Sequence, residues 1–156
     1  MRFLFIIIFV LPCIFLLGQK KNMPKVVNNQ EKLENMIAEL AKANESDVIK
    51  WRRHLHQYPE LSNREFKTMA YIAENLKGLD VSIETGMAHT GVVAVLNTGK
   101  PGPVIGLRAD MDGLPVYERV KLPFASKEES EYLGQKVGVM HACGHDTHIA
   151  MLLGAA

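Results

Sequence analysis

The sequence predicts an α/β domain, and three observations lead to this fold class. Apolar residues recur at helical spacing between residues 31 and 76. Short apolar segments typical of buried strands follow between residues 81 and 107, separated by turn-forming residues. A last apolar helix is predicted from residue 147 onwards. Helices that precede and follow buried strands are typical of a sheet covered by helices.

Residues 1–18 have the composition of a signal peptide. Arg2 is the only charged residue in this stretch, and residues 3–17 are almost entirely apolar. A membrane-spanning helix needs roughly 20 apolar residues, whereas a shorter run behind a positive charge is typical of a signal peptide. We expect cleavage after Gly18 and export to the periplasm or the medium. An uncleaved leader that anchors the protein in a membrane is the alternative.

The remainder divides into a polar linker over residues 19–30 and one domain over residues 31–156. The helical period predicts a first helix over residues 31–44. A second helix is predicted over about residues 46–58, with a serine or an aspartate at its start as the amino-terminal cap.

A third helix is predicted to begin at the capping-box pattern of Ser62 and Glu65 and to end at Gly78. Strands come next, and the polar stretch over residues 117–137 is predicted to be mostly irregular. Residues 108–115 leave the carboxyl end of the last strand, where open α/β sheets place a ligand crevice. The predicted strands are residues 81–84, 91–96 and 104–107.

Cys143 and His145 carry the strongest chemical signal. Residues two apart cannot share one helix face, but on a tight turn around the intervening glycine both side chains can converge. Thiolate and neutral imidazole are ligands that zinc and similar divalent metals prefer. A buried cysteine beside a helix-capping Asp146 would show the same pattern. The acidic pair upstream, Asp110 and Asp112, favours the metal interpretation.

Five strings of residues occur in order from about Val48 to the last residue. They are HQYPELS at 56–62, RADMDGLP at 108–115 with Glu118, PFAS at 123–126, GVMHACGHD at 138–146 and HIAMLLGAA at 148–156. In these strings the sequence resembles the metal-dependent amidohydrolases of a metallopeptidase clan. That family includes hippurate hydrolases, bacterial N-acyl-amino-acid deacylases and plant auxin-conjugate hydrolases.

The resemblance implies the amino-terminal part of a zinc-exopeptidase-like catalytic domain, with a three-layer α/β/α fold that is incomplete here. It also implies a two-metal centre, with zinc or manganese, in which a metal-activated water cleaves the amide bond of N-acyl amino acids. Cys143 would be a thiolate ligand and His145 an imidazole ligand. Asp112 would orient a ligand or the metal-bound water without binding the metal itself. A homodimer is compatible with complete members of the family.

The sequence departs from the family beyond the Cys/His turn. In the family, a Glu-Glu pair supplies the general base and a ligand, and further ligand histidines lie beyond that pair. The sequence lacks these residues, so we expect an amino-terminal fragment that is inactive by itself. Glu128 and Glu129 are adjacent, but they precede the turn within a polar run and are interpreted as solvated surface.

Other polar residues of the five strings receive structural interpretations. Asp110 is expected to pair with Arg108 or with a backbone donor. His56 is expected to form a packing corner between two helices. His141 and His148 stay ambiguous, because each could hydrogen-bond within the site or serve the fold.

Composition excludes some functions and leaves two alternatives. The net charge is +1 with both signs interspersed, so no face for nucleic acid is expected. Cys13 and Cys143 are the only cysteines, which excludes a disulfide framework. Membrane contact is expected only through the leader. One alternative is a cysteine hydrolase with Cys143 as nucleophile and His141 or His145 as base. The other is a non-catalytic truncated product that binds metal weakly or associates with another chain.

Overall fold

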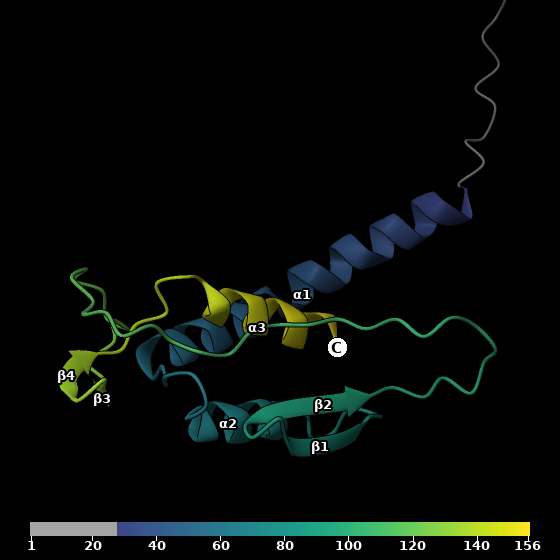
Figure 1. Ribbon diagram of the computed structural model, residues 1–156. Helices are drawn as coiled ribbons and strands as arrows, with labels where there is room; N and C mark the ends of the chain where they lie inside the picture. Colours follow the sequence, from purple (N-terminus) through teal and green to yellow (C-terminus); the bar gives the residue numbers. More distant parts are fainter. Residues whose placement is uncertain (1–27) are drawn as a thin grey trace, which may run out of the picture.

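The computed structural model describes residues 28–156 and shows an incomplete α/β domain, which confirms the predicted fold class (Figure 1). The signal peptide expected over residues 1–18 and most of the linker expected over residues 19–30 lie outside the described residues. Between residues 28 and 156, no helix combines the length and apolar character that crossing a bilayer requires. The elements are α1 (Asn29–Gln57), α2 (Phe66–Leu76), β1 (Ser82–Met87), β2 (Gly91–Val95), β3 (Glu129–Tyr132), β4 (Gln135–Gly138) and α3 (His145–Ala155).

α1 is one continuous helix where the sequence analysis predicted two. Asn28 caps its amino terminus, because the side chain accepts a hydrogen bond from the Gln30 backbone N–H at 3.2 Å. The predicted linker is therefore too long by its last two residues, which lie in the helix. Ser46 and Asp47 lie exposed inside α1 and cap nothing. No Gly or Pro interrupts the chain there, so the backbone hydrogen bonds continue through both residues.

α2 begins near the predicted place but without the predicted capping box. The carboxylate of Glu60 accepts hydrogen bonds from the backbone N–H groups of Lys67 and Thr68, at 3.2 and 2.8 Å. Glu65 is the capping residue by position, but its side chain makes no capping bond. Its carboxylate instead accepts a hydrogen bond from the Thr90 hydroxyl at 2.7 Å, and both residues are buried. An acidic group from outside the helix thus satisfies the free amides.

The strands form two separate antiparallel hairpins. β1 pairs with β2, and the two strands overlap the strands predicted over residues 81–84 and 91–96. β3 pairs with β4 inside the stretch that was predicted to be irregular, and Leu133 and Gly134 form its two-residue turn with positive φ angles of 51° and 73°. Residues 104–107 are not a strand. Among the described residues they have no hydrogen-bonded neighbour, which a strand requires.

The core lies where the carboxyl-terminal half of α1 packs against α3, and α2 contributes two of its side chains to the same cluster (Figure 1). Gly154 lets α3 approach α1 closely, because a Cβ at this position would lie 2.7 Å from Val48 Cγ2. The amino-terminal half of α1 extends past the other elements and leaves its apolar side chains exposed. The buried cluster consists of Leu55, Ile72, Leu76, Ile149 and Leu153.

Candidate functional site

The turn that carries Cys143 and His145 ends at the amino terminus of α3. Gly144 is the residue before the helix and has a φ of 85°, a left-handed conformation that glycine adopts without steric cost. His145 is the first residue of α3, and Cys143 is an exposed free thiol just before the turn. The left-handed residue between them means that Cys143 and His145 do not share one regular helix.

Asp112 fixes the orientation of the His145 ring. His145 Nδ1 lies 2.9 Å from the Asp112 backbone oxygen and 3.0 Å from its Oδ1. Both oxygens accept, so Nδ1 carries the ring proton and Nε2 keeps a free lone pair. No residue of the described range donates to Nε2. An imidazole anchored in this way through one nitrogen is the usual arrangement of a metal ligand.

Two backbone contacts hold the segment of Asp112 in place. The Gly113 N–H donates to the Glu60 carbonyl at 2.7 Å, in a parallel bridge between Leu61 and Gly113. Leu114 and Met140 exchange two backbone hydrogen bonds, at 2.8 and 3.0 Å. The strings around residues 60, 112 and 140, far apart in the sequence, therefore meet at one place.

The residues present fit one side of a metal centre. Cys143 offers a thiol and His145 a free ring nitrogen, a donor set that suits zinc or a similar metal. Within residues 28–156, no group of three or more His, Cys, Asp or Glu side chains is arranged to hold a metal ion. A closed site would need further ligands in addition to these two.

His141 lies in the same region and lacks hydrogen-bond partners among the described residues. It is buried, and neither of its ring nitrogens has a partner among the described residues. The same holds for Asp146 Oδ1. Burial lowers the pKa of His141 to about 4, so the ring is neutral at pH 7. Unpaired buried polar atoms each cost about 1–3 kcal/mol, and such groups in native proteins are normally satisfied by water, an ion or another segment.

Asp110, His148 and Glu129 lie at the surface. The Arg108 guanidinium donates to Asp110 Oδ1 at 2.7 Å, which confirms the predicted pairing and lowers the pKa of that carboxyl. His148 is exposed on α3. Glu129 lies exposed in β3 and pairs with Lys136, in agreement with the surface interpretation.

His56 has more partners than a packing corner requires. Its Nδ1 lies 2.7 Å from Asp146 Oδ2 and its Nε2 lies 3.0 Å from Glu118 Oε1, and the residue is only 4% exposed. Arg52 Nε also reaches Asp146 Oδ2, at 3.0 Å. The sequence analysis missed this buried network. A signal for it was present in the sequence, because His56, Glu118 and Asp146 all belong to the strings that carry the resemblance.

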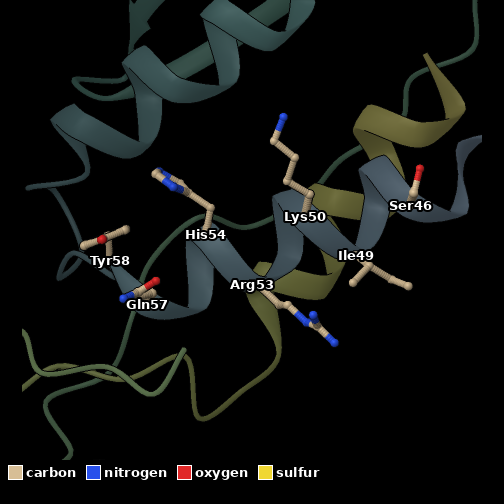
Figure 2. Close-up of a pocket in the computed structure, with 7 residues that line it drawn as sticks. All are labelled: Ser46, Ile49, Lys50, Arg53, His54, Gln57 and Tyr58. Carbon is tan, nitrogen blue, oxygen red and sulfur yellow. The ribbon is translucent and has the colours of Figure 1, made fainter. Parts of the chain in front are cut away.

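A hollow in the described structure lies away from this turn. It measures about 440 Å³ and follows the outer face of α1, between Ser46 and Tyr58. Figure 2 shows Lys50 and Arg53 extending outward from the same helix, whereas the ring of His54 stacks on that of Tyr71, with centroids 3.9 Å apart. No side chain of the Cys/His turn lines this hollow, so we assign it no role in the chemistry.

Comparison with known families identifies the family of this chain. Residues 106–156 match the model of peptidase family M20/M25/M40. The chain belongs to this family. The matched residues include Asp112, Cys143 and His145, so the turn and the segment that anchors it both lie within the shared part.

Relatives and solved structures cover most of this chain. It is 48% identical to thermostable carboxypeptidase 1 of Saccharolobus solfataricus over 81% of its own length and 29% of that protein. It is 50% identical to the N-acetyl-L-cysteine deacetylase of Bacillus subtilis over 72% of its length and 25% of that protein. A dinuclear metal-binding M20 peptidase of Bacillus subtilis superposes with a TM-score of 0.62 at 42% identity, over 72% of this chain and 30% of that one. The chain thus spans less than a third of the proteins it matches.

Proposed function

We propose that the protein acts in the metal-dependent hydrolysis of an amide bond in an N-acyl amino acid or a small peptide-like substrate. The observation that carries the proposal is the contact by which Asp112 holds the His145 ring, on the turn that also carries the exposed thiol of Cys143. The relatives support the reaction class, because a carboxypeptidase, a deacetylase and an N-acyl-L-amino acid amidohydrolase are all named for cleaving amide bonds. Hippurate-like substrates are our specific proposal.

Each of the three residues has one task in this proposal. A bound divalent metal, zinc or manganese, would polarise the scissile carbonyl and lower the pKa of its bound water towards 7. Cys143 loses its proton and offers a thiolate. His145 offers Nε2, and Asp112 accepts the Nδ1 proton, which keeps the ring in the tautomer that binds metal.

Cobalt(II) binding tests this assignment, because a cobalt–thiolate bond absorbs strongly in the near ultraviolet. We expect the unaltered chain to develop this absorption weakly, since only two ligands are provided, and more strongly as the pH rises and the thiol ionises. Cys143→Ser should abolish it. His145→Gln should weaken binding, whereas His148→Gln, a change on the exposed neighbouring histidine, should not. Equal binding by all four proteins would contradict the assignment.

Hydrolysis is measured on the same samples with zinc and with manganese. We expect hippurate and N-acetylmethionine to be cleaved only at the background rate by this chain alone, because the described residues complete no metal site. Turnover that depends on Cys143 would show that two ligands suffice and would contradict this expectation.

A cysteine hydrolase receives less support from the geometry. A nucleophilic cysteine needs a base within hydrogen-bond reach. Among the described residues, neither His141 nor His145 hydrogen-bonds to Cys143. Should activity be found, a chelator would abolish it in a metal enzyme and leave it intact in a thiol enzyme.

Association with another chain is a second candidate function, and one observation favours it. Val104, Ile105 and Leu107 are 99%, 78% and 68% exposed. A run of apolar residues this exposed is typical of an interaction surface. Light scattering after size-exclusion chromatography tests it, since a monomer at tens of micromolar would argue against this role.

We also propose that the protein is exported. The support is the sequence of residues 1–18 alone, with Arg2 before an apolar run. An uncleaved leader would leave the domain anchored on the outer side of the membrane.

A further inference from the structure

The buried network of His56, Asp146, Glu118 and Arg52 connects three separate segments next to the Cys/His turn. His56 lies in the last turn of α1, Asp146 in the first turn of α3, and Glu118 in the loop between β2 and β3. The Glu118 carboxylate also accepts a hydrogen bond from the backbone N–H of Ser126. One imidazole ring therefore joins α1, α3 and a loop that is otherwise irregular.

Each ring nitrogen of His56 faces a buried carboxylate. Arg52 Nη2 also lies 3.4 Å from Nδ1, so the ring contacts two carboxylates and one guanidinium. The Asp146 side chain is 1% exposed and the Glu118 side chain is 1% exposed. In such a setting hydrogen bonds between charged groups are short and directional, and loss of one partner leaves a buried charge.

Asp146 is the residue directly after His145. The two contacts to its Oδ2, from His56 Nδ1 at 2.7 Å and from Arg52 Nε at 3.0 Å, fix the rotation of the first turn of α3. His145 lies in this same turn, and Cys143 lies two residues before it. The direction of both proposed ligands therefore depends on where Asp146 is held.

We propose that His56 is a positioning residue, which holds Asp146 and thereby aligns Cys143 and His145 on one metal ion. This role rests on the proposed metal site. His56 does not touch the metal in this proposal, and its bond to Asp146 matters more than its bond to Glu118. The contribution of groups outside the coordination shell to metal affinity is commonly about 10- to 100-fold.

Two substitutions of His56 separate its two bonds. In His56→Asn the amide nitrogen replaces Nδ1 and can still donate to Asp146. In His56→Gln the amide nitrogen replaces Nε2 and can still donate to Glu118. We expect His56→Gln to lower cobalt affinity, measured by the thiolate absorption, by about tenfold or more. His56→Asn should retain affinity within a few-fold, which a purely structural role would not predict.

Arg52 and Arg53 provide a matched pair at the surface for the case in which the His56 variants fail to fold. Both guanidinium groups lie over the ring of Phe124, at 5.3 and 5.1 Å, but only Arg52 pairs with Asp146. Arg52→Met should therefore weaken cobalt binding several-fold, while Arg53→Met should not. Circular dichroism confirms that each variant keeps its helices.

The outcomes distinguish this proposal from the one it rests on. If the unaltered chain shows no thiolate absorption, or if Cys143→Ser leaves it unchanged, the metal site itself is wrong and the positioning role falls with it. If that absorption is present and depends on Cys143, equal cobalt affinity for the two folded His56 variants would overturn the positioning role alone. Should those variants not fold, equal affinity for the two arginine variants would overturn it in the same way.

Discussion

A single methyl group added at Gly113 should disturb the packing near the candidate site. A Cβ added there would lie 2.9 Å from Pro59 Cβ, 3.0 Å from Val139 Cγ1 and 3.3 Å from the Glu60 carbonyl oxygen. None of these atoms is the end of a flexible side chain, so the backbone has to shift. Overpacking of this kind costs about 1–3 kcal/mol of unfolding free energy.

The same shift would disturb Asp112. Gly113 donates its N–H to the Glu60 carbonyl at 2.7 Å, and that contact holds the segment from which Asp112 anchors the His145 ring. Gly113→Ala should therefore lower cobalt affinity as well as stability. Gly102→Ala is the matched control, because nothing lies within 4 Å of its added Cβ and its φ is not positive. It should leave stability unchanged or raise it by about 0.4–1 kcal/mol.

Urea unfolding followed by the fluorescence of Trp51 measures both effects. Trp51 is the single tryptophan of the chain, and it packs against the core cluster while its Nε1 donates to Asn75 at 2.7 Å. With a urea dependence of about 1–3 kcal/mol per molar, the midpoint of Gly113→Ala should fall by roughly 1 M below that of the control. Coincident unfolding curves for the two alanine variants would refute the close packing at Gly113.

Three further predictions concern stability, local structure and processing. Burial lowers the pKa of His141 from 6.5 to about 4. Between these pH values His141 is therefore protonated in the unfolded chain and neutral in the folded chain. Stability should thus fall as the pH is lowered from 6.5 towards 4, and His141→Gln should reduce this dependence in urea titrations at several pH values. Glu60→Ala should cost about 1 kcal/mol, since the first amides of α2 lose their acceptor, while Glu60→Gln should cost less in the same assay. Amino-terminal sequencing of the protein from its host should begin at Gln19, and an intact Met1 on cytosolic material would contradict export.

The sequence alone determined the family and the fold class, and it predicted the conformation of the turn. Cys143, Gly144 and His145 are adjacent, and the glycine between the two proposed ligands permits a left-handed turn whatever surrounds it. The pairing of Asp110 with Arg108 was predictable for the same reason, since the residues lie two apart. Signals of this kind are local, so they can be read from neighbouring residues.

Only the tertiary structure decided which groups meet across long distances in the chain. The cap of α2 comes from Glu60 and not from Ser62, because the bend after α1 brings that carboxylate to the free amides. Residues 104–107 have the composition of a strand, but a strand also needs a neighbour, and none of the described residues provides one. The bond between His56 and Asp146 joins residues 90 positions apart. Such a contact depends on how α1 packs against α3, and no local pattern in the sequence contains that information.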